Sequence, residues 1–383
     1  MKEQLEQFEF WATEVIFGRI KGLRARLLCI FLRGVSWIFY VGVKIRLYLY
    51  RHRIKPSQAA GVLTISVGNI TAGGTGKTPV VEMLAKQLRA QGKRVAILSR
   101  GYKSHALKKP QTLWSEKTGL SEEDLPKIVS DGEQVYLGPK YAGDEPYMLA
   151  KNLDGVAVLV DKKRTKAAQF AIKYLKSDVL LLDDGMQYLD LHHDFDVVLV
   201  DANYPYGTGF MLPRGTLREP APHLRRATHI LVTKSGGQVH QDLNEQLRKY
   251  NPCAMLMTSS HHEQYLQEVH GDQQLPLSYL QGKHVIAVSG IAYPMSFEEK
   301  LEKLGADIIA TRRFVDHHEY TLKEVNKIAQ LAADQGADAI IMTEKDAVKF
   351  PKPSHLDLPL FYLRIEIDVF DGQEPLQKWI NSL

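Results

Sequence analysis

A glycine-rich loop with the residue types needed to bind nucleotide phosphates lies near residue 70. The apolar segment 62–67 is expected to form a buried strand before it, and a helical pattern follows over 79–89. Small residues in the loop let consecutive backbone N–H groups face phosphate oxygens, while Lys77 can reach the outer phosphates and Thr78 can bind Mg²⁺. The residues of this predicted ATP-phosphate site are Asn69, Thr71, Ala72, Gly73, Gly74, Thr75, Gly76, Lys77 and Thr78.

The glycine positions of the loop depart from the usual eight-residue phosphate-binding pattern. Thr71 stands where the first glycine normally lies, while Gly73 and Gly74 occupy positions inside the loop. A glycine-rich turn with a chance Gly-Lys-Thr is the alternative, but the strand before the loop and the helix after it favour phosphate binding. We therefore expect a phosphate site whose loop conformation can differ from the usual one.

Two neighbouring carboxylates follow a short apolar segment in the middle of the chain. Residues 180–182 are all leucine and lead directly into Asp183, Asp184 and Gly185, so a buried strand would end at the acids. Ligands of open α/β sheets bind at the carboxyl ends of strands, where a P-loop enzyme holds Mg²⁺ with an aspartate. Asp-Asp-Gly is also a common turn, but beside a phosphate loop we favour metal binding by these two aspartates.

Two further clusters combine acids or histidines with residues that restrict the backbone. Asp144 and Glu145 lie between Gly143 and Pro146 before a helical pattern, where they could cap the helix and complement its dipole. Residues 314–318 read Phe-Val-Asp-His-His and could be a capped loop with surface histidines. Residue types and spacing leave these structural interpretations open, and they do not pair one cluster with the other.

Other charged positions lie at the ends of predicted strands or in turns. Arg100 and Arg164 each follow a predicted strand, and Arg100 could face the nucleotide or the substrate. Residues 215–220 form a charged, turn-forming segment, and residues 343–346 (Thr-Glu-Lys-Asp) end another apolar strand, where they could equally form a structural cap. Taken singly, each of these segments could be a solvated loop.

A basic, amphipathic helix is predicted near the N-terminus. From Ile16 to Val41, apolar residues recur at intervals of three and four, which places them on one helical face. The basic residues that flank this stripe are Arg19, Lys21, Arg24, Arg26, Arg33, Lys44, Arg46, Arg51, Arg53 and Lys55. A helix packed on the protein's own core is the alternative, but no acidic residue offsets the basic ones, which favours an anionic membrane surface. The longest apolar run, 27–43, is too short and too charged for a spanning helix, so we expect an interfacial position.

Composition narrows the class of protein. The 383-residue chain is 44% hydrophobic with a formal charge of +5, which allows a buried core and argues against general nucleic-acid binding. Cys29 and Cys253 have no metal-ligand spacing, so neither a disulfide framework nor a zinc site is expected, as is typical of a reducing cytoplasm. Residues 1–14 lack the pattern of a cleaved secretion signal, so no export is expected.

Alternating strand and helix patterns predict an α/β fold. We expect an N-terminal membrane-surface helix within residues 1–57 and a P-loop α/β domain with a mostly parallel sheet over 58–235. Residues 236–383 would form a second, smaller α/β domain with linker strands, beginning with a strand at 283–288 and a helix at 297–304.

Taken in order, these motifs resemble the tetraacyldisaccharide 4'-kinase family along nearly the whole chain. The motifs that carry the resemblance lie at 67–79, 99–102, 143–146, 183–187, 217–220, 316–318 and 343–349. The family shares the threonine at the position of Thr71, but it often has Phe-Gln-His at 186–188, where this chain has Met-Gln-Tyr, so no histidine role is inferred there. The resemblance implies transfer of the γ-phosphoryl group of ATP, with Mg²⁺, to the 4'-hydroxyl of a tetraacylated glucosamine disaccharide 1-phosphate. The product would be lipid IVA of lipid A biosynthesis.

The resemblance also implies roles for individual residues. Asp144 corresponds to the family's catalytic base, and His317 to the histidine that forms a dyad with it, although spacing alone would also allow His318. Asp183 and Asp184 correspond to the acids of the Mg²⁺ and phosphate site. The positions that help to organise the site correspond to Arg100, Glu145, Arg164, Gln187, Arg218 and Glu219.

Location and partners follow from the same resemblance and from the basic helix. We expect the cytoplasmic face of the bacterial inner membrane, an acylated disaccharide 1-phosphate as substrate, no nucleic acid and no obligate protein partner. The rival is a membrane-recruited ATPase switch, in which residues 232–234 (Val-Thr-Lys) would be a base-recognition loop of GTPase type. Such a switch would hydrolyse ATP without lipid and would not need the motifs at 143–146 and 316–318, so we favour the kinase.

Overall fold

The computed structural model describes residue 8 and residues 11–353 and 358–383, which form two compact units. Unit 1 contains the described residues up to Lys77 together with 181–260 and 369–383, and unit 2 contains 78–180 and 261–368. We describe each unit by itself. Residues 1–7 and 9–10, which include much of the segment expected to lack a secretion signal, lie outside the described residues. The domain boundaries at 57/58 and 235/236 stay a prediction.

Unit 1 is built on parallel strands that are buried on both faces. Strand β1 (Leu63–Asn69) pairs in parallel with β6 (Phe195–Asp201), β6 with β7 (His229–Thr233), and β7 with the start of β8 (Met255–Glu268). Strand β5 (Val179–Asp183) lies on the other side of β1. Because parallel strands share one carboxyl edge, the polar residues that end β1, β5, β6 and β7 meet at that edge.

Helices cover the strands of unit 1 with apolar side chains. Helix α8 (Gln241–Tyr250) and the 3₁₀ helix η1 (Ala221–Arg226) share a core with β6 and β7, and α12 (Gln373–Asn381) packs Trp379 against β6 and β7. The near-continuous apolar runs of these strands are typical of a sheet covered on both faces. The predicted α/β class, with mostly parallel strands, is therefore confirmed.

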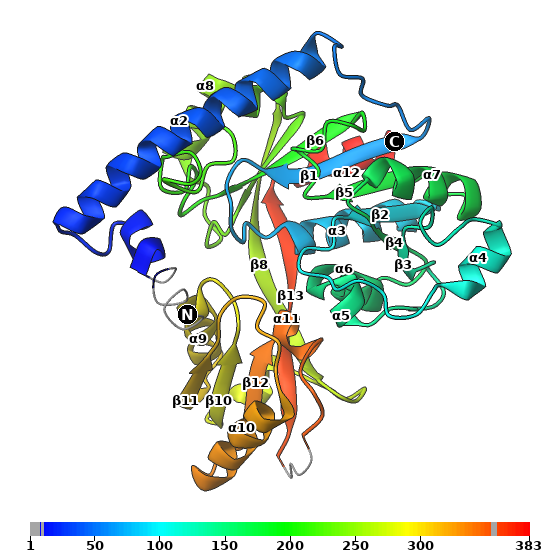
Figure 1. The fold of residues 1–383 in the computed structure, drawn as a ribbon. Coiled ribbons are helices and arrows are strands. Elements are labelled where there is room, and N and C mark those ends of the chain that lie inside the picture. Colours follow the sequence, from blue (N-terminus) through cyan, green and yellow to red (C-terminus); the bar gives the residue numbers. More distant parts are fainter. Residues whose placement is uncertain (1–7, 9–10, 354–357) are drawn as a thin grey trace. The chain divides into compact units, whose positions relative to one another are not determined.

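The N-terminal helix α2 (Leu23–Arg51) is 29 residues long and, in Figure 1, lies along one side of unit 1. By length and composition alone it could cross a membrane, and 6% of its apolar window is buried. The helix is longer than the apolar run 27–43 because its helical backbone continues through the basic residues on both sides of that run, so its length does not exclude a membrane span. The interfacial position stays a prediction.

The two faces of α2 have different environments. Ser36 donates to the carbonyl of Met211 at 2.9 Å, and Arg46 donates to the carbonyl of Gln187 at 2.8 Å. At 3.6 residues per turn, Ser36 and Arg46 lie on the same side of the helix, and the exposed apolar stripe lies on the opposite side. The exposed apolar residues of this stripe are Leu23, Leu27, Ile30, Phe31, Trp37, Ile38, Ile45 and Tyr48.

The first part of unit 2 continues from the phosphate loop. Helix α3 (Lys77–Ala90) leads to β2 (Val95–Ser99), which pairs in parallel with β4 (Ala157–Val160), while β3 (Lys127–Ser130) pairs antiparallel with β4. The helices of this part are α4 (Thr112–Thr118), α5 (Pro139–Ala142), α6 (Asp144–Asn152) and α7 (Arg164–Tyr174). Helix α6 begins at Asp144, so the fold positions this carboxylate at a helix N-terminus.

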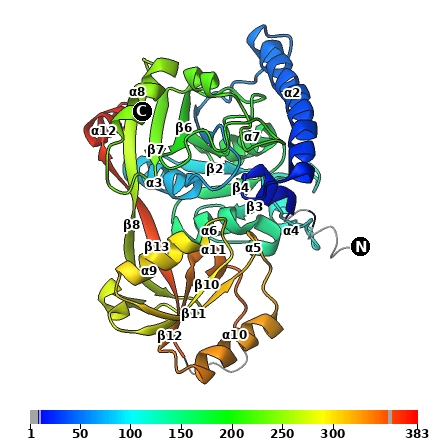
Figure 2. The same ribbon diagram turned by 90° about the vertical axis from the view of Figure 1, so that its left-hand side faces the viewer.

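The second part of unit 2 is an α/β sandwich. Strand β10 (His284–Ser289) lies between β11 (Asp307–Arg313) and β12 (Ala339–Thr343), and β12 pairs with β13 (Leu360–Asp371), all in parallel. Alternate residues of β10 face α9 (Pro294–Lys303) and α10 (Leu322–Asp334), which cover opposite faces of the sheet (Figure 2). The short elements are β9 (Gln274–Leu275), η2 (Leu277–Leu280) and α11 (Glu344–Ala347). The strand and helix predicted at 283–288 and 297–304 are confirmed.

Candidate active site

The phosphate loop of unit 1 joins the end of β1 to the start of α3. Asn69 is buried at the end of β1, where its amide donates to the hydroxyl of Thr71 at 3.2 Å and its side-chain oxygen accepts from Lys77 at 3.3 Å. Thr78 follows as the second residue of α3. The predicted order of strand, loop and helix is therefore present, with Lys77 anchored at the helix start.

The threonine at position 71 has a structural explanation. Thr71 forms an antiparallel bridge with Leu217, and the next backbone N–H donates to the carbonyl of Thr216 at 2.6 Å. The loop instead needs glycine at Gly73, whose φ of 115° lies in the left-handed region that side chains disfavour. Thr71 thus ties the loop to the segment that carries Arg218.

The two aspartates at the end of β5 lie at the same edge. Asp183 is buried, and Asp184 has a left-handed φ of 54°. Both oxygens of Asp184 accept from Arg218, at 2.7 and 2.8 Å, and Lys77 lies 3.6 Å from one of them. Residues far apart in the chain therefore gather two cations and two carboxylates beside the phosphate loop.

A buried carboxylate holds this edge of unit 1 together. Glu219 accepts from Gln187 at 3.1 Å and from Arg226 at 2.8 Å, and His223 contacts its other oxygen at 2.8 Å. Burial by itself would raise the pKa of Glu219, but these partners outweigh it and hold the pKa below its usual value. Gln187 also donates to the carbonyl of Asn69 at 3.0 Å, which connects the network to the phosphate loop.

Several residues of this edge were not found by sequence reasoning. His223 and Arg226 were missed, although the four-residue spacing from Glu219 to His223 is a helical contact distance. The segment Thr233-Lys234 was considered only as a base-recognition loop. Its hydroxyl and ammonium groups donate to the loop carbonyls of Thr75 and Gly74, at 2.9 and 2.5 Å, so they brace the phosphate loop.

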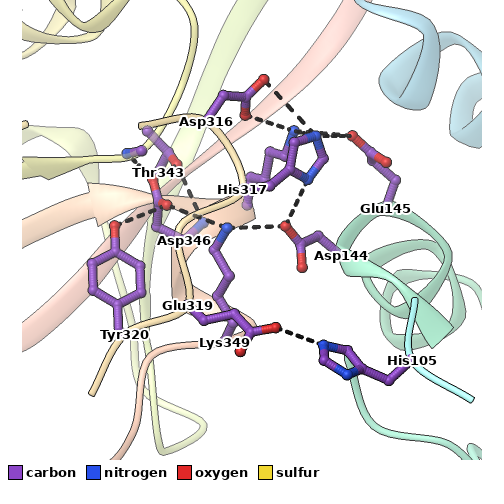
Figure 3. Close-up of polar contacts among 12 residues, drawn as sticks. His105, Asp144, Glu145, Asp316, His317, Glu319, Tyr320, Thr343, Asp346 and Lys349 are labelled. Atoms are coloured by element: carbon purple, nitrogen blue, oxygen red, sulfur yellow. Dashed lines mark hydrogen bonds and ion pairs between the residues drawn. The ribbon is translucent and has the colours of Figure 1, made fainter. Parts of the chain in front are cut away.

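In unit 2, a carboxylate and an imidazole form a hydrogen-bonded pair (Figure 3). Nδ1 of His317 lies 3.0 Å from Oδ2 of Asp144, and both side chains are largely buried. The N-cap of α6 is Gly143, and the carboxylate of Asp144 contacts His317 and Lys349, so Asp144 does not act as a helix cap. His317 has a left-handed φ of 64°, a conformation that in non-glycine residues often accompanies function.

Two lysines from the segment after β12 surround this pair. Nζ of Lys349 donates to Oδ2 of Asp144 at 2.9 Å, and Nζ of Lys345 lies 3.1 Å from Nε2 of His317. Burial alone would raise the pKa of Asp144, but the hydrogen bonds from His317 and Lys349 outweigh it, and the pKa lies below its usual value. Lys345 also contacts Glu145 at 3.0 Å.

The adjacent histidine has a different environment. The ring of His318 stacks on Phe314, with 4.6 Å between the ring centroids, and its Nε2 lies 3.2 Å from Glu324. The structure therefore brings His317, and not His318, to Asp144.

The segment 343–349 contains both structural and site-facing residues. The Thr343 side chain caps α11, and the buried Asp346 accepts from the backbone of Gly290 at 2.8 Å and from Tyr320 at 2.9 Å. The cap interpretation thus holds for Thr343 and Asp346. Lys345 and Lys349 instead face the Asp144–His317 pair, a role that the sequence did not reveal.

The remaining predicted site residues lie in unit 2. Arg100 is exposed just after β2, and Arg164 is buried at the first position of α7. Glu145 follows Asp144 in α6 and lies 3.9 Å from Nε2 of His317. The structure thus gathers Glu145 with Asp144, whereas it shows no contact of Arg100 or Arg164 with that pair among the described residues.

Comparisons with a family model and with known proteins all point to the same family. The model of the family described as LpxK, tetraacyldisaccharide-1-P 4'-kinase, matches residues 28–383. The tetraacyldisaccharide 4'-kinase of Halothermothrix orenii is 35% identical over all of this chain and 99% of its own length. That of Syntrophus aciditrophicus is 37% identical over 87% of each chain.

A solved structure supports the same relationship. The crystal structure of LpxK from Aquifex aeolicus in complex with ATP superimposes with a TM-score of 0.69 and 28% sequence identity. The match covers 91% of this chain and 97% of the Aquifex chain. The family match over residues 28–383, the full-length relatives and this fold together confirm the resemblance seen in the motifs, and the chain belongs to the tetraacyldisaccharide-1-P 4'-kinase family.

Proposed function

We propose that the chain transfers the γ-phosphoryl group of ATP to the 4'-hydroxyl of a tetraacylated disaccharide 1-phosphate, which forms lipid IVA for lipid A. Family membership supports the kinase activity and the lipid substrate. The observation that carries the proposal is the hydrogen bond between Asp144 and His317. A hydroxyl acceptor requires a group that takes its proton, whereas a nucleotide switch has no need of such a pair.

ATP would be held by the phosphate loop and its neighbours in unit 1. The loop N–H groups would face the phosphates, and Lys77 and Arg218, both within reach of Asp184, would neutralise the charge on the transferred group. Removing either cation would therefore weaken stabilisation of the transition state.

Mg²⁺ fits the oxygen ligands at this edge. Magnesium is usually held by one or two carboxylates together with substrate phosphates, and Asp183, Asp184 and the hydroxyl of Thr78 offer such ligands. Among the residues that the structure describes, no cluster of three or more acids, histidines or cysteines forms a protein-only metal site. When bound, the ion would neutralise charge on the β- and γ-phosphates.

Asp144 would accept the proton of the 4'-hydroxyl. Its lowered pKa makes it a weak base, which suits a loose phosphoryl-transfer transition state in which the attacking oxygen loses its proton late. Positioning of the hydroxyl would then matter more than base strength, and His317 would keep the carboxylate in place.

The exposed stripe of α2 would bind the membrane that holds the lipid substrate. Tyr50 hydrogen-bonds to Asp190, and Ser36 and Arg46 contact the same unit, so α2 is held by protein along much of its length. A helix docked in this way would lie in the interface with its opposite, apolar side in the acyl boundary.

The positions of the basic residues in α2 favour binding to the cytoplasmic face of the bacterial inner membrane. Arg26, Arg33, Lys44 and Arg51 are separated by seven, eleven and seven positions, which places them in one row beside the apolar stripe. Such a row would contact lipid headgroups, because the anionic headgroups of a cytoplasmic leaflet attract lysine and arginine side chains electrostatically.

Transfer of labelled γ-phosphate from ATP to purified tetraacyldisaccharide 1-phosphate in detergent micelles tests the activity. We expect labelled lipid with the wild type, and none with the Lys77→Ala variant or with a lipid that lacks the 4'-hydroxyl. ATP hydrolysis that needs no lipid and yields no labelled lipid would instead favour the ATPase switch.

A further inference from the structure

Charged groups surround the Asp144–His317 pair, and the proposed function gives its two lysines no role. Two further carboxylates, those of Glu145 and Asp316, lie near the imidazole (Figure 3), and one lysine contacts each member of the pair. Nε2 of His317 lies 3.1 Å from Lys345, and it is farther from the carboxylates of Glu145 and Asp316, at 3.9 and 3.8 Å. The nearest polar neighbour of Nε2 is therefore a lysine.

Lys345 carries its positive charge in this position. Its ammonium group lies 3.0 Å from Glu145 and 3.0 Å from Asp316. Burial by itself would lower the pKa of Lys345, but the two carboxylates outweigh burial and raise the pKa above its usual value. A lysine ammonium has three N–H donors and no acceptor. Its contact with Nε2 can only be a hydrogen bond that it donates.

This contact determines which nitrogen of His317 carries the proton. Nε2 must present its lone pair to Lys345, so the ring is neutral and its single proton is on Nδ1. We propose that Lys345 is a positioning residue that fixes His317 in the Nδ1–H tautomer, so that the imidazole donates to Oδ2 of Asp144. The inference rests on the proposed role of Asp144 as the base.

The same arrangement assigns different roles to the two oxygens of Asp144. Oδ2 accepts both from His317, at 3.0 Å, and from Lys349, at 2.9 Å. Among the described residues, Oδ1 has no hydrogen-bond partner, so Oδ1 is the oxygen open to the substrate. During transfer, the 4'-oxygen forms its bond to the γ-phosphorus while the bond from that phosphorus to the β,γ-bridging oxygen breaks and ADP leaves. The hydroxyl proton moves to Oδ1.

Without Lys345 the opposite tautomer would no longer be excluded. The neighbours of Nε2 would then be Glu145 and Asp316, at 3.9 and 3.8 Å, whose carboxylates could accept a hydrogen bond from Nε2 after a small side-chain rotation and so stabilise a proton there. Nδ1 would turn a lone pair toward Oδ2 of Asp144, and the bond that orients the base would be lost. Asp144 would retain only Lys349 as a partner on that oxygen.

Nitrogen-15 spectra of the histidine rings in the full-length protein test this inference. A His317→Gln variant identifies the His317 signals. In the wild type we expect Nδ1 to be protonated and Nε2 to be unprotonated. Lys345→Met removes the donor with little change in side-chain length and should place the proton on Nε2. Lys345→Arg keeps a charged donor and should restore the wild-type pattern.

Two control variants separate the contact from a general loss of charge. Lys349→Met also removes a lysine beside Asp144, but Lys349 does not contact the imidazole, so the proton should stay on Nδ1. Lys327→Met removes an exposed lysine from α10 and should change neither the spectra nor the activity. Thermal unfolding of each variant shows whether the fold is retained.

Kinetics give a second readout. For Lys345→Met we expect kcat to fall about tenfold, which is the effect of losing one orienting hydrogen bond. The KM for ATP should stay within about twofold of the wild-type value. Lys345→Arg should recover most of kcat. An equal loss of kcat in both variants, with no change in the His317 spectrum, would overturn the role of Lys345.

The outcomes distinguish this inference from the proposed function. If wild-type His317 carries its proton on Nε2, the tautomer assignment is wrong whether or not the protein is a kinase. If the tautomer is as expected but Asp144→Ala keeps full activity, Lys345 still fixes the imidazole, and the role of Asp144 as base is wrong instead.

Discussion

His317 and His318 are consecutive in sequence, yet their rings belong to separate interaction networks. His317 bonds to Asp144 at 3.0 Å, whereas His318 stacks on Phe314 and contacts Glu324 at 3.2 Å. The left-handed backbone at His317 turns the chain between the two rings. His317 thus faces the carboxylate of Asp144, and His318 packs against Phe314 of its own loop.

Substitution of the two histidines should have different effects. His317→Ala removes a partner of Asp144, the proposed base, and should lower kcat by about 100-fold, the lower end of the range for acid–base groups, with ATP affinity retained. His318→Ala removes a stacked ring and should cost about 1 kcal/mol of unfolding free energy while kcat changes little. Steady-state kinetics and urea unfolding of both variants measure this contrast. Equal losses of kcat would contradict it.

Asp144 and Lys77 should contribute at different stages of the reaction. Asp144→Ala should reduce turnover about 1000-fold or more while the Kd for ATP stays near that of the wild type, because the carboxylate contacts His317 and Lys349. Lys77→Ala should reduce both turnover and ATP affinity, because the ammonium of Lys77 lies at the phosphate loop. Titration with ATP and single-turnover transfer separate the two effects. Near-normal turnover of Asp144→Ala would remove it as the base.

A buried charge network in unit 2 should be important for stability. Arg364 on β13 contacts Glu82 on α3 and donates to Glu344 at 2.8 Å, and all three side chains are largely buried. Burial raises the pKa of Glu344, and Arg364→Met would leave Glu344 without its cation and Glu82 with only the partly exposed Lys86. We expect a loss of about 3–5 kcal/mol in unfolding free energy, measured by urea denaturation.

Lys86 offers a matched control for that experiment. It contacts the same Glu82 at 2.8 Å, but its side chain is 43% exposed. Lys86→Met should therefore cost less than about 1 kcal/mol. A comparable loss in both variants would show that burial of the Arg364 network is not the cause.

His229 in unit 1 should make stability depend on pH. Its ring contacts those of Phe195 and Trp379, and burial lowers its pKa to about 4. The unfolded state, with a pKa of about 6.5, takes up a proton that the folded state does not, so stability falls as pH falls from 6.5 toward 4. Between pH 7 and pH 5 this group should cost about 2 kcal/mol. Urea midpoints of the wild type and of His229→Asn should differ in pH dependence by that amount.

The apolar stripe of α2 should control membrane binding. Leu27 and Ile38 are exposed on the side opposite the docking contacts, and changing both to Asp should abolish binding to anionic vesicles. Arg26→Gln with Lys44→Gln should weaken binding by roughly 30-fold at low salt, since each basic residue near the surface contributes about 1 kcal/mol. Kinase activity on a micelle-dispersed substrate should remain. Unchanged vesicle sedimentation in both variants would refute an interfacial role for α2.

Local patterns in the sequence predicted the elements and many of the groups that carry chemistry. The apolar segments that became β1 and β5 lead directly into the phosphate loop and the aspartates, because a buried strand and the residue that ends it are adjacent in the chain. The N-terminal helix was equally visible from its spacing of apolar residues, although α2 begins at Leu23 and the predicted helical pattern began at Ile16.

The pairing of site residues could not be derived in the same way. Asp144 and His317 are separated by 173 positions, and Lys349 lies 205 positions from Asp144. No periodicity connects residues so far apart, and a lysine that contacts the Asp144–His317 pair has the same local pattern as one that is solvated. The role of Lys234 was missed for the same reason, because its partner Gly74 lies 160 positions away, whereas Arg226 lies only seven positions from its partner Glu219.

The sequence by itself thus determined the α/β class, the phosphate-loop motif and the family, because these depend on residue type and short-range spacing. Only the tertiary structure decided that His317 rather than His318 meets Asp144, and that Lys345 and Lys349 surround the pair. The physical reason is that the position of a hydrogen-bond partner depends on how α6, α11 and the loop at 314–318 pack together, which is set by the hydrophobic burial of entire elements.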